Sequence, residues 1–200
     1  MSLLRPNPAD LESASHASGE YSQEERNLLL RLAHDSILAA LEHREISLDP
    51  SSPHLAEPRG AFASLYLKGD LRGCVGYVFP SHALYKTVAE VARAAAFEDT
   101  RFCPVTLDEA RNLEIELSIL SPPQPIEPDS IEVGRHGLVI SMGGYRGLLL
   151  PQVAVEHHWD RATFLQQTCR KAGLPADAWQ KGAKIEAFTA EVFGEKSMHK

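Results

Sequence analysis

The sequence predicts an α+β fold of two intertwined subdomains, with helices packed on mostly antiparallel sheet. Two hairpin-like pairs of strands occur along the chain, and each is followed by a helical segment and a further strand. The second strand of each hairpin carries Arg-Gly, as LRG at 71–73 and YRG at 145–147. Hairpins mixed with helices are typical of α+β proteins rather than of a parallel doubly wound sheet. The repeated order suggests a β-β-α-β duplication.

The first half opens with a predicted helix over residues 21–43. Its apolar side chains recur at helical intervals, at Leu29, Leu32, Ala33, Ile37, Ala40 and Leu41. Ser22 has the residue type of an N-cap, and Glu25 three residues later completes the spacing of a capping box.

A hairpin, a helix and a strand follow. Residues 61–79 alternate as two strands joined by a turn at Lys68-Gly69-Asp70. Residues 81–99 predict a helix capped by the Ser81 hydroxyl, and LEIELSIL at 113–120 predicts a strand. The Pro-rich run at 121–130 must leave the sheet, because proline cannot donate ladder hydrogen bonds.

The second half repeats this order. HGLVISMGGYRGLLL, at 136–150, predicts a hairpin that turns at Gly143-Gly144. Residues 160–173 predict a helix with Asp160 as its N-cap and Gly173 as its stop. PADAWQK at 175–181 predicts a further short helix. KIEAFTAEVF, at 184–193, alternates strictly and predicts one final strand.

The length of 200 residues suits one sizeable domain or two small intertwined ones, and the composition is that of a globular protein. We expect a loose N-terminal arm at 1–20, a domain over 21–195 with halves of about 21–125 and 126–195, and a short tail at 196–200. With 20 Lys and Arg against 27 Asp and Glu, the formal charge is −7. This excess of acid disfavours nucleic-acid and anionic-membrane binding.

Cysteine usage and hydropathy point to a reduced cytoplasmic protein. The three cysteines, Cys74, Cys103 and Cys169, do not suggest a disulfide framework. No apolar run approaches the roughly 20 residues needed to span a bilayer, and the first 20 residues lack the apolar core of a signal peptide.

Five motifs occur in an order that resembles the AMMECR family, known in prokaryotes as AmmeMemoRadiSam system protein A. They are LRGCVG at 71–76, AAAFEDTRFCPVT at 94–106, EIELSILSPP at 114–123, GLLLPQVAVEHHWD at 147–160 and CRKAGLPADAW at 169–179. Val75 stands where the family hallmark has isoleucine. The resemblance implies two subdomains with a cleft between them, and association with a Memo-like protein and a radical-SAM enzyme. It implies no settled activity and no known cofactor.

The LRGCVG stretch is the candidate site. Arg72 and Cys74 are two apart on a strand and are expected to share a face, and an adjacent guanidinium favours thiolate over thiol. Cys74 is therefore a candidate catalytic nucleophile, with Arg72 holding an anionic group. Gly73 and Gly76 leave room for a substrate or for another backbone. The alternative is a small cysteine buried between glycines for packing alone.

Charged residues elsewhere extend this hypothesis. Asp99 and Arg101 either form a local salt bridge after the helix or join Arg72 in an anion-binding corner. Glu116 shares a strand face with Glu114. That face is either exposed to solvent or lines the cleft, where Glu116 would act as a general base or pair with Arg72.

The other reactive residue types receive structural predictions. His157 and His158 are adjacent on a segment expected to be extended, so their side chains should point apart. Zinc-ligand spacings are absent from the sequence, so we expect no metal site. Cys169 should lie on the apolar face of its helix.

Two functions stay open at this stage. The first is an enzyme-like or small-molecule-binding protein with Cys74 at its centre, which as an enzyme would be cysteine-dependent and of unidentified reaction class. The second is a non-catalytic adaptor that docks a partner protein through the same glycine-rich surface. The sequence names no cofactor, substrate or oligomeric state.

Overall fold

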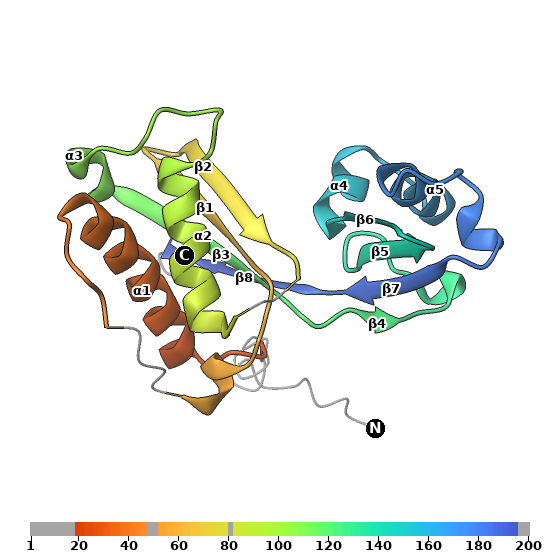
Figure 1. The fold of residues 1–200 in the computed structure, drawn as a ribbon, viewed down its shortest axis with the longest axis horizontal. Coiled ribbons are helices and arrows are strands. Elements are labelled where there is room, and N and C mark those ends of the chain that lie inside the picture. The colour runs from red at the N-terminus through yellow and green to blue at the C-terminus, as the bar shows by residue number, and fades with distance from the viewer. Residues whose placement is uncertain (1–18, 48–51, 80–81, 196–200) are drawn as a thin grey trace, which may run out of the picture.

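The computed structural model describes residues 19–47, 52–79 and 82–195. They form two lobes that lie side by side (Figure 1). Most of the expected N-terminal arm, the tail at 196–200 and the predicted cap Ser81 lie outside the described residues. No helix in the described ranges is long and apolar enough to cross a membrane.

The first lobe is a four-stranded antiparallel sheet, in the order β2-β1-β3-β8, with helices on one face. Its elements are α1 (Gln23–Leu41), a 3₁₀ turn η3 (Pro53–Ala56), β1 (Ala61–Leu67), β2 (Asp70–Tyr77), α2 (Leu84–Phe97), α3 (Leu107–Ala110), β3 (Leu113–Leu120) and β8 (Ala190–Gly194). Alternate residues of β1, such as Ala63 and Leu65, are fully buried on the face that packs against α2, and α1 packs against α2 and β3. Among the described residues, no helix lies on the opposite face of this sheet (Figure 1), and we call it the open face of the first sheet.

The second lobe repeats the plan with a sheet in the order β4-β7-β5-β6. Its elements are β4 (Gln124–Pro125), a 3₁₀ turn η4 (Pro128–Ser130), β5 (Gly137–Met142), β6 (Tyr145–Leu149), α4 (Pro151–Glu156), α5 (Arg161–Lys171), a 3₁₀ turn η5 (Ala178–Gln180) and β7 (Lys184–Phe188). All ladders in both sheets are antiparallel. The predicted α+β class with mostly antiparallel sheet is therefore confirmed.

The second lobe is continuous in sequence, from β4 to β7, and is inserted between β3 and β8 of the first lobe, which is therefore discontinuous. The chain leaves β3 in the first sheet and enters β4 in the second, and it returns from β7 to β8. At this crossing the Ser121 N–H donates to the Thr189 carbonyl and the Thr189 N–H donates to the Ser121 hydroxyl, both at 2.9 Å. The prediction of one strand over 184–193 is wrong, because the segment changes sheet at Thr189.

The two halves share one register. In the first lobe Gly73 and Ile115 flank Leu65 on neighbouring strands. In the second lobe Gly147 and Ile185 flank Ile140 in the same way. Each of these two glycines also meets a helix: a Cβ on Gly73 would lie 2.1 Å from the Ala95 carbonyl oxygen of α2, and one on Gly147 would lie 2.3 Å from the Ala172 nitrogen that ends α5. The shared Arg-Gly pair therefore marks equivalent positions, as a duplication requires.

Local signals gave several correct predictions. The capping box of Ser22 and Glu25 is present, and Asp160 caps α5. Lys68 and Gly69 turn the first hairpin with positive φ. The helix α2, however, has Ala83 at its N-cap position, without a side-chain hydrogen bond.

Other predictions need correction. The segment before His157 is the helix α4 rather than extended chain. The short helix predicted in PADAWQK is present as the 3₁₀ helix η5. The Pro-rich run leaves the first sheet as expected, but Gln124 and Pro125 form an edge strand of the second. An edge tolerates proline because only one side of the strand needs its backbone donors.

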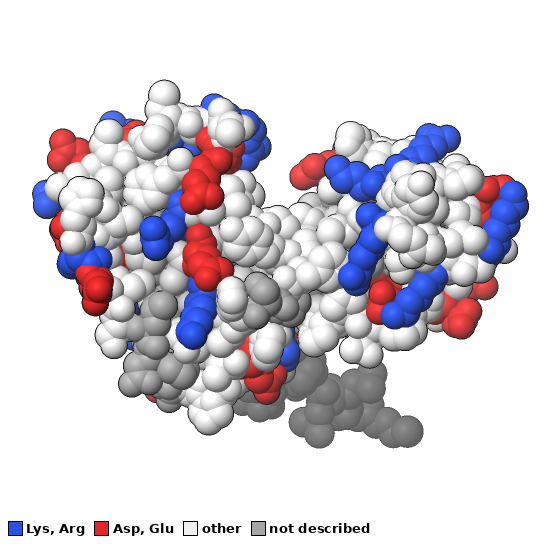
Figure 2. Space-filling model, viewed as in Figure 1, with Lys and Arg blue, Asp and Glu red and all other residues white. Residues whose placement is uncertain are grey.

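An apolar cluster joins the lobes. Leu120, Val139 and Phe188 are buried there, and Phe62 and Leu148 pack against them. We call this the junction cluster. Above it the surface is hollowed between the lobes (Figure 2), with β2 on one side and β6 and α4 on the other (Figure 1).

We predict that Gly73→Ala destabilises the protein by about 3 kcal/mol, because the added methyl group would overlap a helix backbone that cannot move alone. Gly147→Ala should behave alike. Gly144→Ala is the matched control, since no atom lies within 4 Å of its Cβ position, and its effect should stay within about 0.5 kcal/mol. Urea unfolding measures all three, and equal stability of the Gly73 and Gly144 variants would contradict the packing argument.

Candidate functional site

A β-bulge places the residues of LRGCVG. Leu65 of β1 lies opposite Gly73, but Tyr66 lies opposite Leu71, so Arg72 is an extra residue in β2. A bulge bends the strand and re-aims the side chains around it. The alternation by which Arg72 and Cys74 were predicted to share a face is interrupted here.

Arg72 bonds to α3 and to the loop that precedes it. Its Nε and Nη2 donate to the two carboxylate oxygens of Glu109 at 3.1 and 3.2 Å. Its Nη1 donates to the Cys103 carbonyl at 2.8 Å, and Nη2 also donates to the Pro104 carbonyl at 3.3 Å. The guanidinium is thus engaged within the protein, and it pairs with Glu109 rather than with Glu116.

Glu109 connects this loop to a helix start. Its carboxylate also accepts from the Thr106 N–H and hydroxyl, in the capping box of α3. Hydrogen bonds from Arg72, followed by those from Thr106, lower the pKa of Glu109 to about 2. The bidentate pair therefore ties α3 to the edge strand β2.

Asp99 and Arg101 bind the backbone of Cys74. The Cys74 N–H donates to Asp99 Oδ2 at 2.9 Å, and Arg101 Nη2 donates to the Cys74 carbonyl at 3.4 Å. The two side chains pair with each other at 2.9 and 2.6 Å. The Arg101 guanidinium, helped by the Cys74 N–H, holds the pKa of Asp99 well below its usual range. This backbone clamp occupies the position that a further strand would take beside β2.

The clamp also indicates which kind of pair Cys74 forms with β1. Because both backbone polar groups of Cys74 point outward, Cys74 and Ser64 form a non-hydrogen-bonded pair, in which side chains approach closely. The Ser64 hydroxyl donates to Cys74 Sγ at 3.3 Å. On the far side of Ser64 lies Glu116 of β3. We call Cys74, Ser64 and Glu116 the thiol row.

The thiol row lies on the open face of the first sheet. Its neighbour Gly73 points into α2, so Cys74 points the other way. All three side chains of the row are partly exposed. Of the predicted site residues, the structure therefore brings Cys74 and Glu116 onto one face, with Ser64 between them.

The second lobe shows what the same positions look like when they serve packing. There the equivalent row is Leu148, Val139 and Glu186. Leu148 and Val139 belong to the junction cluster. The first lobe instead carries a thiol and a hydroxyl in places where its counterpart carries hydrocarbon.

The two glycines of LRGCVG have packing roles. Gly73 makes room for the α2 backbone, and a Cβ on Gly76 would lie 2.2 Å from the Phe62 ring. Phe62 therefore lies directly over Gly76 and reaches the junction cluster. The space predicted for a substrate at these glycines is occupied by protein groups.

The remaining reactive residues lie apart from the thiol row. His157 ends α4 and stacks on Trp159 with ring centroids 4.7 Å apart. Cys169 is fully buried on the apolar face of α5, as predicted, and this burial raises the pKa of its thiol. Within the described ranges, no three His, Cys, Asp or Glu side chains gather as a metal site.

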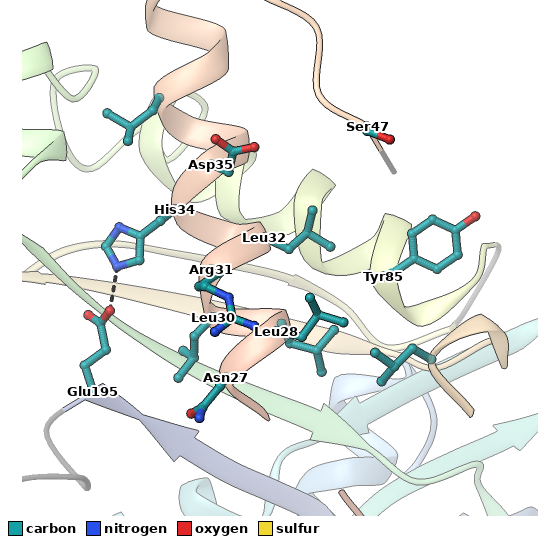
Figure 3. Close-up of a pocket in the computed structure, with 13 residues that line it drawn as sticks. Asn27, Leu28, Leu30, Arg31, Leu32, His34, Asp35, Ser47, Tyr85 and Glu195 are labelled. Carbon is teal, nitrogen blue, oxygen red and sulfur yellow. Dashed lines mark hydrogen bonds and ion pairs between the residues drawn. The ribbon is translucent and has the colours of Figure 1, made fainter. Parts of the chain in front are cut away.

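A cavity of about 790 Å³ lies elsewhere, along the outer side of α1 (Figure 3). Leu28, Leu32 and Tyr85 give it an apolar wall, and at its far side His34 Nε2 lies 2.8 Å from Glu195 Oε1. Because α1 packs on the helix-bearing face of the first sheet, the sheet separates this cavity from the thiol row.

Sequence reasoning missed Ser64 and Glu109. For Glu109 a signal existed, since Thr106-x-x-Glu109 has the spacing of a capping box. Ser64 had none, because its place opposite Cys74 depends on the bulge at Arg72.

Comparison with known proteins identifies the family. The AMMECR1 family model matches residues 30–193. The chain belongs to the AMMECR1 family. The predicted resemblance is thereby confirmed.

Relatives of this AMMECR1 protein occur in archaea. A protein of Methanosarcina acetivorans is 44% identical over 150 residues, which cover 72% of this chain and 75% of the relative. One of Methanococcus aeolicus is 41% identical over 186 residues, covering 88% and 94%. The crystal structure of an uncharacterised protein from Pyrococcus horikoshii matches with a TM-score of 0.70 and 42% identity, over 84% of this chain and 90% of that one.

We predict that the Glu109 carboxylate stabilises the fold above its ordinary pKa of 4.5 and loses this effect as the pH falls through its folded pKa of about 2. The difference in free energy of unfolding between wild type and Glu109→Gln should therefore be largest near pH 6 and shrink toward pH 2. Glu132→Gln, which breaks an exposed pair with Arg135, is the control and should change stability little at any pH. A Glu109→Gln effect that does not vary with pH would contradict the assignment.

Proposed function

We propose that this AMMECR1 protein binds a small molecule on the open face of its first sheet, with the Cys74 thiol as the ligand-contacting and reacting group. The observation that carries the proposal is the hydrogen bond from the Ser64 hydroxyl to Cys74 Sγ, at 3.3 Å on a partly exposed face. A hydroxyl that donates to sulfur stabilises a thiolate more than a thiol, and the thiolate is the nucleophile.

Each neighbouring residue then has a role. Glu116, next in the row, acts as a general base or holds a cationic group of the ligand. Asp99 and Arg101 are positioning residues, because they hold the Cys74 backbone. Arg72 positions the loop after α2 through Glu109, which replaces the anion-holding role expected for it. The Memo-like and radical-SAM partners implied by the family resemblance would supply or use this ligand.

A second function is favoured by one feature of β2. Leu71, Tyr77 and Phe79, on and just after this edge strand, are 38%, 43% and 40% exposed. Large apolar side chains along a sheet edge suit the docking of another chain. On this alternative the protein is a non-catalytic adaptor, and the Memo-like protein is the first partner to test.

Thiol reactivity tests the preferred function. In a Cys103→Ser background, Cys74 should react with iodoacetamide at pH 6.5 about tenfold faster than an ordinary partly exposed thiol, while the buried Cys169 stays unreactive. Ser64→Ala should slow the reaction of Cys74 several-fold, because it removes the donor to sulfur. Ser118→Ala is the matched control: it lies on the same face, one row away, opposite Phe62.

Either of two results would reject the thiol proposal: Cys74 reacting at the rate of a free cysteine peptide, or identical rates in the Ser64 and Ser118 variants. The adaptor alternative would then be tested by co-purification with the Memo-like protein. Tyr77→Glu should abolish that association and Val192→Glu, an equally exposed control at the other edge of the sheet, should not.

A further inference from the structure

The second Arg-Gly pair has an arginine with different surroundings. Arg146 in β6 precedes the glycine that meets a helix, as Arg72 does in the first lobe. Arg146 is regularly paired opposite Ser141, whereas Arg72 is the extra residue of a bulge. The Arg72 guanidinium donates hydrogen bonds to the Glu109 carboxylate and to two backbone carbonyls. In the described part of the chain, the Arg146 guanidinium donates no hydrogen bond; its Nη2 lies 3.9 Å from Glu186 Oε2. Its side chain is 46% exposed.

An aromatic ring holds this guanidinium in place. The Arg146 Cζ lies 3.7 Å from the centroid of Phe79, which follows β2 in the other lobe. Stacking on a ring fixes the plane of the guanidinium but leaves the N–H groups at its rim free. Because the side chain is already ordered, less entropy is lost when those donors bind a ligand.

Two further polar groups lie in the same row. Ser141 of β5 is opposite Arg146 on one side and opposite Lys184 of β7 on the other. Lys184 Nζ lies 2.7 Å from Glu186 Oε1, and its side chain is 59% exposed. The row is on the face away from α5, because the adjacent residue Ile140 belongs to the core beneath that helix. We call Arg146, Ser141 and Lys184 the basic row.

One carboxylate draws both cations toward the row. Glu186 is only 8% exposed and faces both Arg146 and Lys184. One negative charge against two positive charges leaves the cluster net cationic in a protein whose overall charge is −7. Lys and Arg side chains also spread over the visible face of this lobe (Figure 2).

We propose that the basic row is an anion-binding site, which takes the phosphate or carboxylate group of a small molecule. Arg146 offers a two-pronged donor, Lys184 a point charge and Ser141 a hydroxyl between them, and these are the groups that oxyanions prefer. The basic row lies in a different sheet from the thiol row, so this proposal can be tested independently of the function proposed for Cys74.

The experiment is a titration of the full chain, followed by ¹H–¹⁵N NMR at low ionic strength, with inorganic phosphate in one arm and acetate in the other. Saturable shifts should centre on the amides of the basic row. The arm with the tighter dissociation constant identifies the preferred group. Cys74→Ser should bind the anion as wild type does, which separates this result from that of the thiol experiment.

Variants that remove one charge each should change the affinity for the anion in a predictable direction. Arg146→Gln should weaken binding at least tenfold, and Lys184→Gln should weaken it several-fold. Glu186→Gln should tighten binding about threefold, because it removes the negative charge that competes with the ligand. Arg135→Gln is the matched control: it changes the charge of the same lobe equally but lies in an exposed pair with Glu132, so binding should be unchanged.

Three results would overturn the proposal: no saturable shift with either anion, equal weakening in the Arg146 and Arg135 variants, or weaker binding in a folded Glu186→Gln variant. Should Glu186→Gln fail to fold, as judged by circular dichroism, the comparison of Arg146 and Arg135 decides alone.

Discussion

The candidate site depends on how the edge strand β2 is held. At Cys74 the sheet has no further strand, and the carboxylate of Asp99 and the guanidinium of Arg101 bind the outward N–H and C=O instead. A few residues before this clamp, Arg72 fastens the same strand to Glu109. Both contacts hold the backbone of β2, and the sulfur of Cys74 lies beside the Ser64 hydroxyl on the open face. The ion pairs that sequence reasoning offered as ligand-binding groups thus serve the thiol by ordering its strand.

Duplication followed by divergence accounts for the contrast between the lobes. Both carry Arg-Gly on the second hairpin strand, and in both the glycine receives a helix backbone. The neighbouring positions then differ: Leu148 and Val139 close the second lobe against the junction cluster, whereas Cys74 and Ser64 leave polar atoms on the surface of the first. For the two arginines it is the second lobe that leaves polar groups available. The Arg72 guanidinium is hydrogen-bonded within the protein, whereas the Arg146 guanidinium keeps its N–H donors available. Each lobe therefore exposes polar groups at a different row of the same framework.

The sequence predicted the helix caps and turns, which depend on residues close together in the chain. It did not predict the pairing between strands, which depends on residues far apart in the chain. The caps of α1 and α5 and the turn at Gly69 depend on residues a few positions apart, and they were found. Counting back from that turn without a bulge would place Ala63 opposite Cys74, so a single extra residue decides that Ser64 is there. The break at Thr189 was equally hidden, because an alternating pattern does not reveal that its two ends pair in different sheets.

Amide hydrogen exchange at Cys74 tests the backbone clamp most directly. A bond to the Asp99 carboxylate should make this edge amide exchange as slowly as the paired amides of β2, and Asp99→Ala should accelerate it by at least about a hundredfold. Asp108→Ala, an exposed aspartate in α3, should leave the rate unchanged. If the Cys74 amide of the wild-type protein exchanges as fast as that of Gly69 in the hairpin turn, nothing holds the edge of β2 at this point and the thiol row loses its support.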